Sequence, residues 1–383
     1  MASWMGQTQA QLSRLENGPA LRHIDRLAAW ARLLDMPQDL LWIALPPGTS
    51  PNRDHHARGN AREMPSPEAH LHFIRSLRSA DRQVGGGHLY ASVTAYLADT
   101  GDLSPQQLPA AFAPKQLLAA TASLNEMAGW MAHDSAAAGP ARKHLYRAMA
   151  LAGHSGDHQL AAQASASISH FACHHGNSRA AISFAQDGLR HLGSGPPHGR
   201  LQSKLLAMQA RGLASGGRVA EAATVLAEAE KALQRETCVT SDWLSPFDTA
   251  SFAIEAARFF LRIGDLAEAR RRLEDALAHT PAVRVRSRAF AQLMLVTALL
   301  GRGELDEACS LVEETLGVVA GLGSAIIGDH LDHVGMLLAP HTTTSPHVTP
   351  LLDRLRSVVR EQAWIASVHA LHEATIQGEP ADG

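Results

Sequence analysis

Residues 252–281, FAIEAARFFLRIGDLAEARRRLEDALAHTP, contain two amphipathic helical patterns joined at a glycine. Alanine and leucine recur at spacings of three and four residues in both halves, which is typical of helices that bury one face. In the second half, Ala269, Leu273 and Ala276 share that face. Gly264 stands where the first helix ends, because glycine adopts a positive φ at little cost. The stretch therefore predicts a helical hairpin.

The same pattern occurs five times along the chain. Its anchor alanines are Ala141, Ala181, Ala222, Ala269 and Ala308, which lie 40, 41, 47 and 39 residues apart. Five residues before the anchors stand Ala136, Gly176, Gly217, Gly264 and Gly303. Twelve residues before them stand Gly129, Ser169, Ala210, Ala257 and Val296, mostly small enough for two helices to approach closely. The repetition predicts stacked helical hairpins, and an unrelated bundle of alanine-rich hairpins is the alternative.

These units resemble degenerate tetratricopeptide repeats over roughly residues 118–320, with Pro281 where that family tends to place proline. Their spacing exceeds the family's usual period of about 34 residues, and most of the family's aromatic positions are missing. The resemblance implies an all-α fold in which an α-solenoid covers residues 118–362. A helical connecting segment at 68–117 precedes it, and a C-terminal helix and frayed tail at 363–383 follow it.

The composition excludes several classes of protein. The 383 residues are 45% hydrophobic with a net charge of −3, so the chain is not compositionally disordered and has no global basic field. Cys173, Cys238 and Cys309 form no CxxC pair, which argues against a disulfide framework and a cysteine zinc site. No apolar stretch is long enough for a membrane span, and the N-terminus has no secretion-signal pattern, so we expect a cytoplasmic protein. Because GxxxxGK[ST], HExxH and GxSxG do not occur, we expect neither an enzyme nor a cofactor.

The most specific local motif is residues 6–18, GQTQAQLSRLENG. Thr8 followed by Gln11 forms a capping box at the start of a short helix, and Gly18 ends that helix. The glutamine, serine and arginine side chains left exposed suit a DNA major groove, where they pair with base edges or phosphate. A capped helix without a role in DNA binding is the alternative.

This motif resembles the recognition helix of Cro and phage-repressor helix-turn-helix domains, the XRE family. The resemblance implies a DNA-binding domain at residues 1–45 that lacks the family's usual first helix, followed by a flexible linker at 46–67. The DNA-contacting residues that it implies are Thr8, Gln9, Ala10, Gln11, Ser13, Arg14 and Asn17. Residues 1–45 contain four arginines and four acidic residues, so their net charge is zero and their attraction to DNA phosphates is weak. We therefore expect the chain to bind DNA as a homodimer.

Taken whole, the chain resembles bacterial regulators that join an XRE-type head to a tetratricopeptide-like tail, and residues 77–97 are similar to the joining segment. The resemblance implies a sequence-specific DNA-binding transcriptional regulator whose repeat domain senses a ligand or protein partner and mediates dimerisation. The alternative is a tetratricopeptide-like interaction scaffold with a vestigial helix-turn-helix.

The repeat resemblance also places the ninth, twelfth and thirteenth residues of each first helix on a concave groove. The groove residues are Trp130, His133, His170, His174, Arg211, Arg258 and Arg262. Such a cationic groove suits a peptide, a small anionic ligand or a protein partner. Asp134 and Glu255 are the internal acids most able to neutralise the groove instead. An exposed helix face without a ligand is the alternative. His170 and His174 are spaced to share one zinc ion, but no carboxylate completes a site, so we predict no metal.

Overall fold

The computed structural model describes residues 67–84, 86, 89–99, 115–235, 240–319 and 321–361. The chain divides into two compact units, Met1–Met64 and Pro65–Gly383, and every described residue belongs to the second. The division falls inside the predicted linker. The predicted helix-turn-helix at 1–45, the linker before Pro67 and the tail at 363–383 lie outside the described residues.

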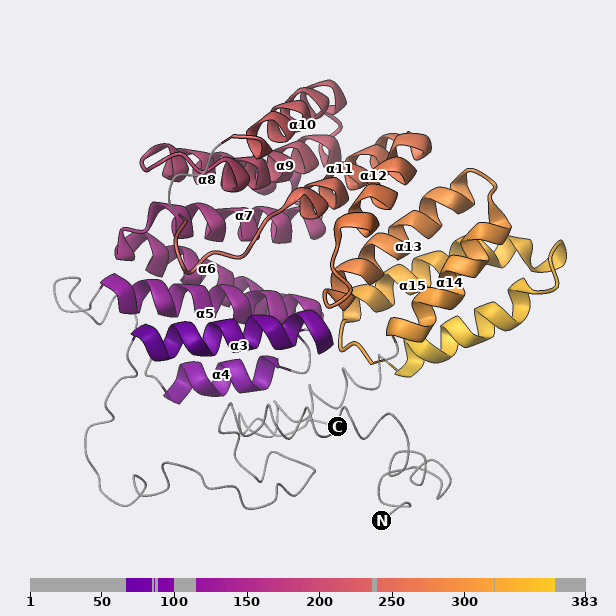
Figure 1. Ribbon diagram of the computed structural model, residues 1–383, viewed down its shortest axis with the longest axis horizontal. Helices are drawn as coiled ribbons and strands as arrows, with labels where there is room; N and C mark the ends of the chain where they lie inside the picture. Colours follow the sequence, from indigo (N-terminus) through magenta and orange to yellow (C-terminus); the bar gives the residue numbers. More distant parts are fainter. Residues whose placement is uncertain are drawn as a thin grey trace, which may run out of the picture. The chain divides into compact units, whose positions relative to one another are not determined.

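Every regular element of the described residues is helical (Figure 1). The first two are α3 (Pro67–Val84) and α4 (Tyr90–Asp99). Five pairs follow: α5 (Lys115–Asp134) with α6 (Ala138–Ser155), α7 (His158–His174) with α8 (Ser178–Gly193), α9 (Gly199–Ser215) with α10 (Val219–Leu233), α11 (Thr249–Ile263) with α12 (Leu266–His279), and α13 (Val285–Gly301) with α14 (Leu305–Val319). Helix α15 (Ala325–Leu338), the 3-10 helix η2 (Ala339–Thr343) and a helical stretch at 348–361 come last. The five pairs coincide with the five predicted units, which confirms the all-α repeat architecture.

The turn of each pair contains a residue in the left-handed conformation. The φ angles are 74° at Gly176 and 79° at Gly217, Gly264 and Gly303. Ala136 adopts a positive φ of 60° at the same place in the first unit. The turn positions predicted five residues before the anchors are therefore confirmed. In the first unit the turn residue is an alanine, for which a positive φ is unfavourable.

The anchor alanines lie at contacts between helices. All five have no exposed surface. The stripe of side chains that follows the anchors is buried as well. Four residues after them stand Leu145, Ala185, Leu226, Leu273 and Val312, which are at most 7% exposed. Gly188, on the same stripe, shows how closely the helices approach, since a Cβ there would overlap Leu205 Cδ2. Larger side chains at these positions would push the helices apart.

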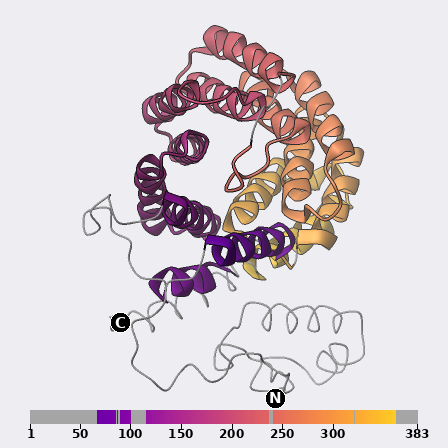
Figure 2. The same ribbon diagram turned by 60° about the vertical axis from the view of Figure 1, so that its left-hand side comes forward.

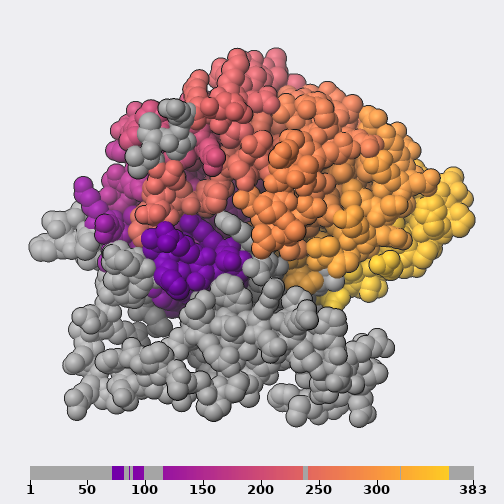
Figure 3. Space-filling view, viewed as in Figure 1, coloured from indigo at the N-terminus to yellow at the C-terminus, as the bar shows by residue number. Residues whose placement is uncertain are grey.

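The first helices of the pairs form one layer. Helix α5 packs against α7, α7 against α9, α9 against α11, and α11 against α13. This layer curves so far that α13 also packs against α3 (Figure 2). Figure 3 shows α3, in indigo, beside the orange residues of the later units. The inner layer is therefore the surface on which side chains from distant units come together.

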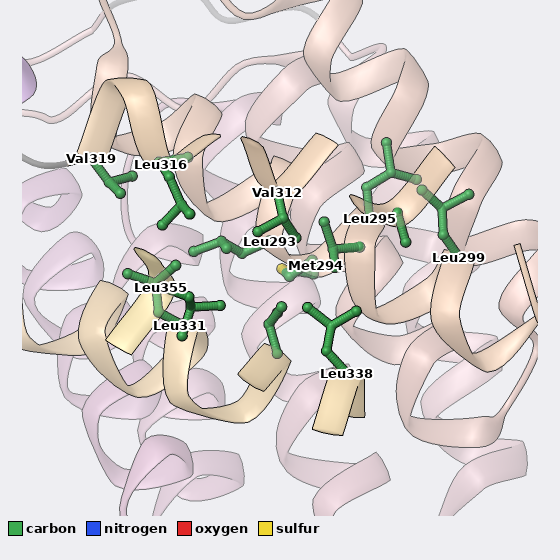
Figure 4. Close-up of a cluster of buried hydrophobic side chains, with 14 of the residues drawn as sticks. Leu293, Met294, Leu295, Leu299, Val312, Leu316, Val319, Leu331, Leu338 and Leu355 are labelled. Carbon is green, nitrogen blue, oxygen red and sulfur yellow. The ribbon is translucent and has the colours of Figure 1, made fainter. Parts of the chain in front are cut away.

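A large apolar core closes the C-terminal end of the stack. Helices α13, α14 and α15 meet the stretch at 348–361 there, with Leu293, Val312, Leu331 and Leu355 at their contacts (Figure 4). Terminal units of a repeat stack need such a cap because their apolar face has no further neighbour. Among the described helices, none combines the length and apolar character that crossing a membrane requires.

Candidate ligand-binding cavity

A cavity of about 340 Å³ lies on the inner layer, lined by residues of α5, α7, α9, α11, α13 and α15. Residues just before α11 complete its wall. Six predicted groove residues line it: Trp130, His133, His170, His174, Arg211 and Arg258. Side chains that lie up to 128 positions apart in the sequence therefore share one site, because the stacking of units aligns equivalent positions of their first helices.

Arg262 departs from the expectation. It is exposed and is not among the residues that line the cavity. Arg262 follows Arg258 by four residues in the last turn of α11, which moves it about 6 Å along the helix axis and past the cavity. The expected convergence of three arginines is thus corrected to two, Arg211 and Arg258.

Arg211 and Arg258 share a single carboxylate, that of Glu255. Arg211 Nη1 lies 3.6 Å from Glu255 Oε2, and Arg258 Nε lies 3.5 Å from Glu255 Oε1. Arg211 also contacts His170, with 2.9 Å between Nη1 and the ring Nδ1. Arg258 Nε and Glu255 Oε2 are buried without a hydrogen-bond partner. Burial lowers the pKa of Arg258; Glu255 opposes this effect and the charge of Arg211 adds to it.

Lys204 is a third cation at the cavity. Among the described residues its side-chain nitrogen has neither a hydrogen-bond nor an ion-pair partner. Burial lowers the pKa of Lys204, and the acids Glu126 and Glu255 partly oppose this effect. The part of the wall formed by α9 and α11 therefore carries more positive charge than Glu255 neutralises.

Arg286, by contrast, is fully paired. Its Nη2 lies 2.7 Å from Asp81 Oδ2 of α3, and its Nη1 lies 2.9 Å from Asp134 Oδ2 of α5. Asp134 also accepts hydrogen bonds from the Gly86 backbone N–H, at 3.1 Å, and from Ser324 Oγ, at 2.6 Å. Burial disfavours the charge of Arg286, but the two carboxylates raise its pKa above the ordinary value. We call Asp81, Asp134 and Arg286 the clasp, because they join α3, α5 and α13.

The two acids expected to neutralise the groove thus differ in their partners. Glu255 contacts Arg211 and Arg258, as expected. Asp134 instead binds Arg286, a residue that the repeat pattern did not indicate. Asp134 therefore contributes to the clasp and not to neutralising the two groove arginines.

The histidines of the cavity are held uncharged. The pKa of His133 is lowered to about 4 and that of His330 to about 3. The pKa values of His170 and His174 are also lowered. Burial is the main cause in all four, and neighbouring arginines and histidines add to it. At neutral pH the positive charge of the site therefore resides on arginine and lysine.

Apolar side chains line the rest of the cavity: Trp130, Met208, Phe247, Ile254, Phe290 and Ile326. A cationic part beside an apolar part fits an anion with an apolar body. Within the described residues, no group of three or more histidine, cysteine, aspartate or glutamate side chains is arranged to hold a metal ion.

Sequence reasoning missed several residues of the site, among them Lys204, Phe247, Arg286 and His330. Lys204 precedes Arg211 by seven residues on α9, and a search at two-turn spacing would have found it. Phe247 lies between two units, in the part of the chain where the anchor spacing rises to 47 residues. Arg286 and His330 come from α13 and α15, and only the curvature of the stack brings them to the cavity.

Comparison with known proteins shows a similarity of fold to solved structures. No protein-family model matches the sequence, and no curated protein matches it either. Similar solved structures include the crystal structure of a Rap protein complexed with competence and sporulation factor. The TM-score is 0.51 and the identity 12%, over 82% of this chain and 87% of that chain. The likeness shows that the two chains share a helical-repeat fold.

Proposed function

We propose that this chain is a helical-repeat binding protein whose cavity holds an anionic ligand or an acidic segment of a protein partner. One observation carries the proposal: Arg211 and Arg258 share one carboxylate, and Lys204 has no ion-pair partner among the described residues. Hydrogen bonds from such cations to carboxylate or phosphate are about twice as strong as neutral ones. An anion would also relieve the repulsion between the two arginines.

The shared fold supports a binding role rather than a catalytic one. The similar Rap protein was crystallised in complex with competence and sporulation factor, so a chain of this fold binds a partner. The interaction scaffold considered as the alternative in the sequence analysis is therefore the reading that we favour for the repeat domain.

We expect an anion that fits the cavity to raise the melting temperature of the full chain. Binding stabilises the folded state by RT ln(1 + [L]/Kd), which is about 2.7 kcal/mol at 100 times Kd. Arg258→Ala should weaken that ligand roughly 10- to 100-fold, because one hydrogen bond to a charged group contributes about 1.5–3 kcal/mol. Thermal shifts against nucleotides, dicarboxylates and acidic peptides, followed by calorimetric titration, measure both effects.

Arg262→Ala is the matched control, because Arg262 is exposed on the same helix and does not line the cavity. It should keep the affinity of the wild type. If no compound shifts the wild type more than it shifts Arg258→Ala, the anion proposal fails. Equal losses in the two variants would place the ligand outside this cavity.

A second candidate function is sequence-specific DNA binding, as a dimeric transcriptional regulator. The motif GQTQAQLSRLENG at residues 6–18 favours it, because its capping box and polar face match a recognition helix. The motif lies outside the described residues, so this candidate rests on the sequence. In such a regulator the cavity would be the sensor, and ligand binding would change the affinity for DNA by a reciprocal coupling.

We expect Gln9→Ala or Gln11→Ala to cost roughly 1–3 kcal/mol at the preferred DNA site and little on random DNA, because base-edge contacts carry specificity. Arg14→Ala should weaken binding to both if it contacts phosphate. Fluorescence anisotropy against selected and random duplexes measures the affinities, and light scattering measures the oligomeric state. Binding without any sequence preference would exclude the regulator.

A further inference from the structure

Residues 240–248 precede α11 and contain no regular secondary structure. We call them the inner segment, because they run inside the curve of the helices (Figure 2). They belong to the part of the chain where the anchor spacing rises to 47 residues. The inner segment is thus an insertion between two units, and its contacts resemble those of a bound peptide.

Two glutamines of α7 bind backbone N–H groups of the inner segment. The Ser241 N–H donates to Gln159 Oε1 at 2.8 Å, and the Ser245 N–H donates to Gln163 Oε1 at 2.9 Å. The two glutamines are one helical turn apart and at most 7% exposed. Gln163 Nε2 donates to Glu126 Oε2 at 2.7 Å, which turns the amide oxygen of Gln163 toward the inner segment. The amide of Gln163 is therefore oriented by the protein.

Donors from α3 and α5 bind backbone carbonyls of the same segment. Arg78 Nη2 lies 2.6 Å from the Trp243 oxygen, and Arg78 Nη1 lies 3.0 Å from the Leu244 oxygen. Ser123 Oγ donates to the Trp243 oxygen as well, at 3.1 Å. Side chains from three helices thus bind four backbone groups within residues 241–245. Recognition of the backbone depends little on the sequence of the bound polypeptide.

Trp243 of the inner segment supplies an apolar anchor on α3 to α7. Trp243 is partly buried, and it packs against apolar clusters formed mainly by α3 to α7. Backbone hydrogen bonds together with an aromatic side chain packed on apolar surface are a common way for a groove to bind a peptide. The contacts between the inner segment and α3, α5 and α7 are therefore those of a receptor surface with its ligand.

We propose that Arg78, Ser123, Gln159 and Gln163 form a peptide-binding surface, and that the inner segment is its intramolecular occupant. An external polypeptide with the same chemistry, an irregular backbone around one aromatic residue, binds there by displacing it. This proposal does not rest on the anion proposal, because none of the four side chains lines the cavity. The inner segment contributes Pro246 and Phe247 to the cavity wall, and the replacement of residues 241–245 described below leaves both in place. The covalent connection gives the inner segment a high effective concentration, so it competes strongly with external peptides.

The test uses the full chain with residues 241–245 replaced by Gly-Ser-Gly-Ser-Gly. The probe is a labelled peptide of residues 240–248, TSDWLSPFD, and fluorescence anisotropy measures its binding. We expect saturable binding to the replaced chain and at least tenfold weaker binding to the wild type, in which the inner segment competes. In the replaced chain, Gln159→Ala should weaken the peptide by about 2- to 10-fold, the effect of one hydrogen bond. Gln202→Ala is the control, because Gln202 bonds Arg235 and does not contact the inner segment.

Circular dichroism and thermal unfolding establish that each variant is folded. A folded replaced chain that does not bind the peptide, or that binds it equally well with Gln159→Ala, would overturn the proposal. If the replaced chain does not fold, Trp243→Ala, which keeps the backbone of the inner segment, takes its place in the same titration. Loss of the fold in both variants would also overturn the proposal, because the inner segment would then be part of the core and not a displaceable ligand.

Discussion

Replacing Arg286 with methionine should lower the free energy of unfolding by about 3–5 kcal/mol, because it removes the cation that two poorly exposed carboxylates share. The side chains of Asp134 and Asp81 are 6% and 19% exposed, and both contact the guanidinium of Arg286. Methionine keeps much of the apolar stem, so the loss reports mainly on the charge. Urea denaturation of the full chain followed by circular dichroism measures it.

Arg302→Met is the control for this experiment. Arg302 pairs with Glu304 at 3.0 Å in contact with solvent, where an ion pair adds little stability. The double variant Arg286→Met with Asp134→Asn should recover part of the loss, because an amide does not need a buried cation. If Arg286→Met costs no more than Arg302→Met, the clasp does not stabilise the fold.

Acidification from pH 7 to pH 5 should also destabilise the chain. Burial lowers the pKa of His133 and His144 to about 4 and that of His330 to about 3, against an ordinary value of 6.5. Below pH 6.5 the unfolded chain takes up protons that the folded chain does not, so each histidine costs up to about 1.4 kcal/mol per pH unit. The stability that depends on the neutral histidines is complete above pH 6.5 and is lost as the pH falls toward 4.

The urea midpoint at pH 7, 6 and 5 measures this effect. Replacing His330 with glutamine should reduce the dependence on pH, because one buried imidazole is removed. His154→Gln is the matched control, since His154 is exposed at the end of α6. A midpoint that stays constant between pH 7 and pH 5 would contradict the neutral state of the buried histidines.

The helical hairpins were predictable because their signals are local. Small residues at spacings of three, four and seven determine which helix faces pack, and a glycine in four of the five units marks where the chain turns. Gly264 and Ala269 illustrate both signals within one stretch of sequence: the first has a φ of 79°, and the second is fully buried. Helices α3 and α4 and the helical stretch at 348–361 do not carry the repeated pattern. Their packing could therefore not be predicted from the sequence.

The candidate site was predictable only where it follows the repeat. Trp130, His170 and Arg211 occupy related positions of three successive units, so stacking alone brings them together. Arg286 reaches the site because the layer curves, and curvature is a sum of small rotations that no single motif encodes. One feature of the sequence indicates the inner segment, namely the long spacing between Ala222 and Ala269.

The clasp has a consequence for how the chain folds. It joins Arg286 to Asp81, which precedes it by 205 residues. In an open repeat array each unit touches only its neighbours, so the ends fray independently and folding propagates from any point. Here the loss of either end breaks a contact of the other, which makes unfolding more nearly all-or-none. Folding should be correspondingly slow, because a long loop has to close before this contact forms.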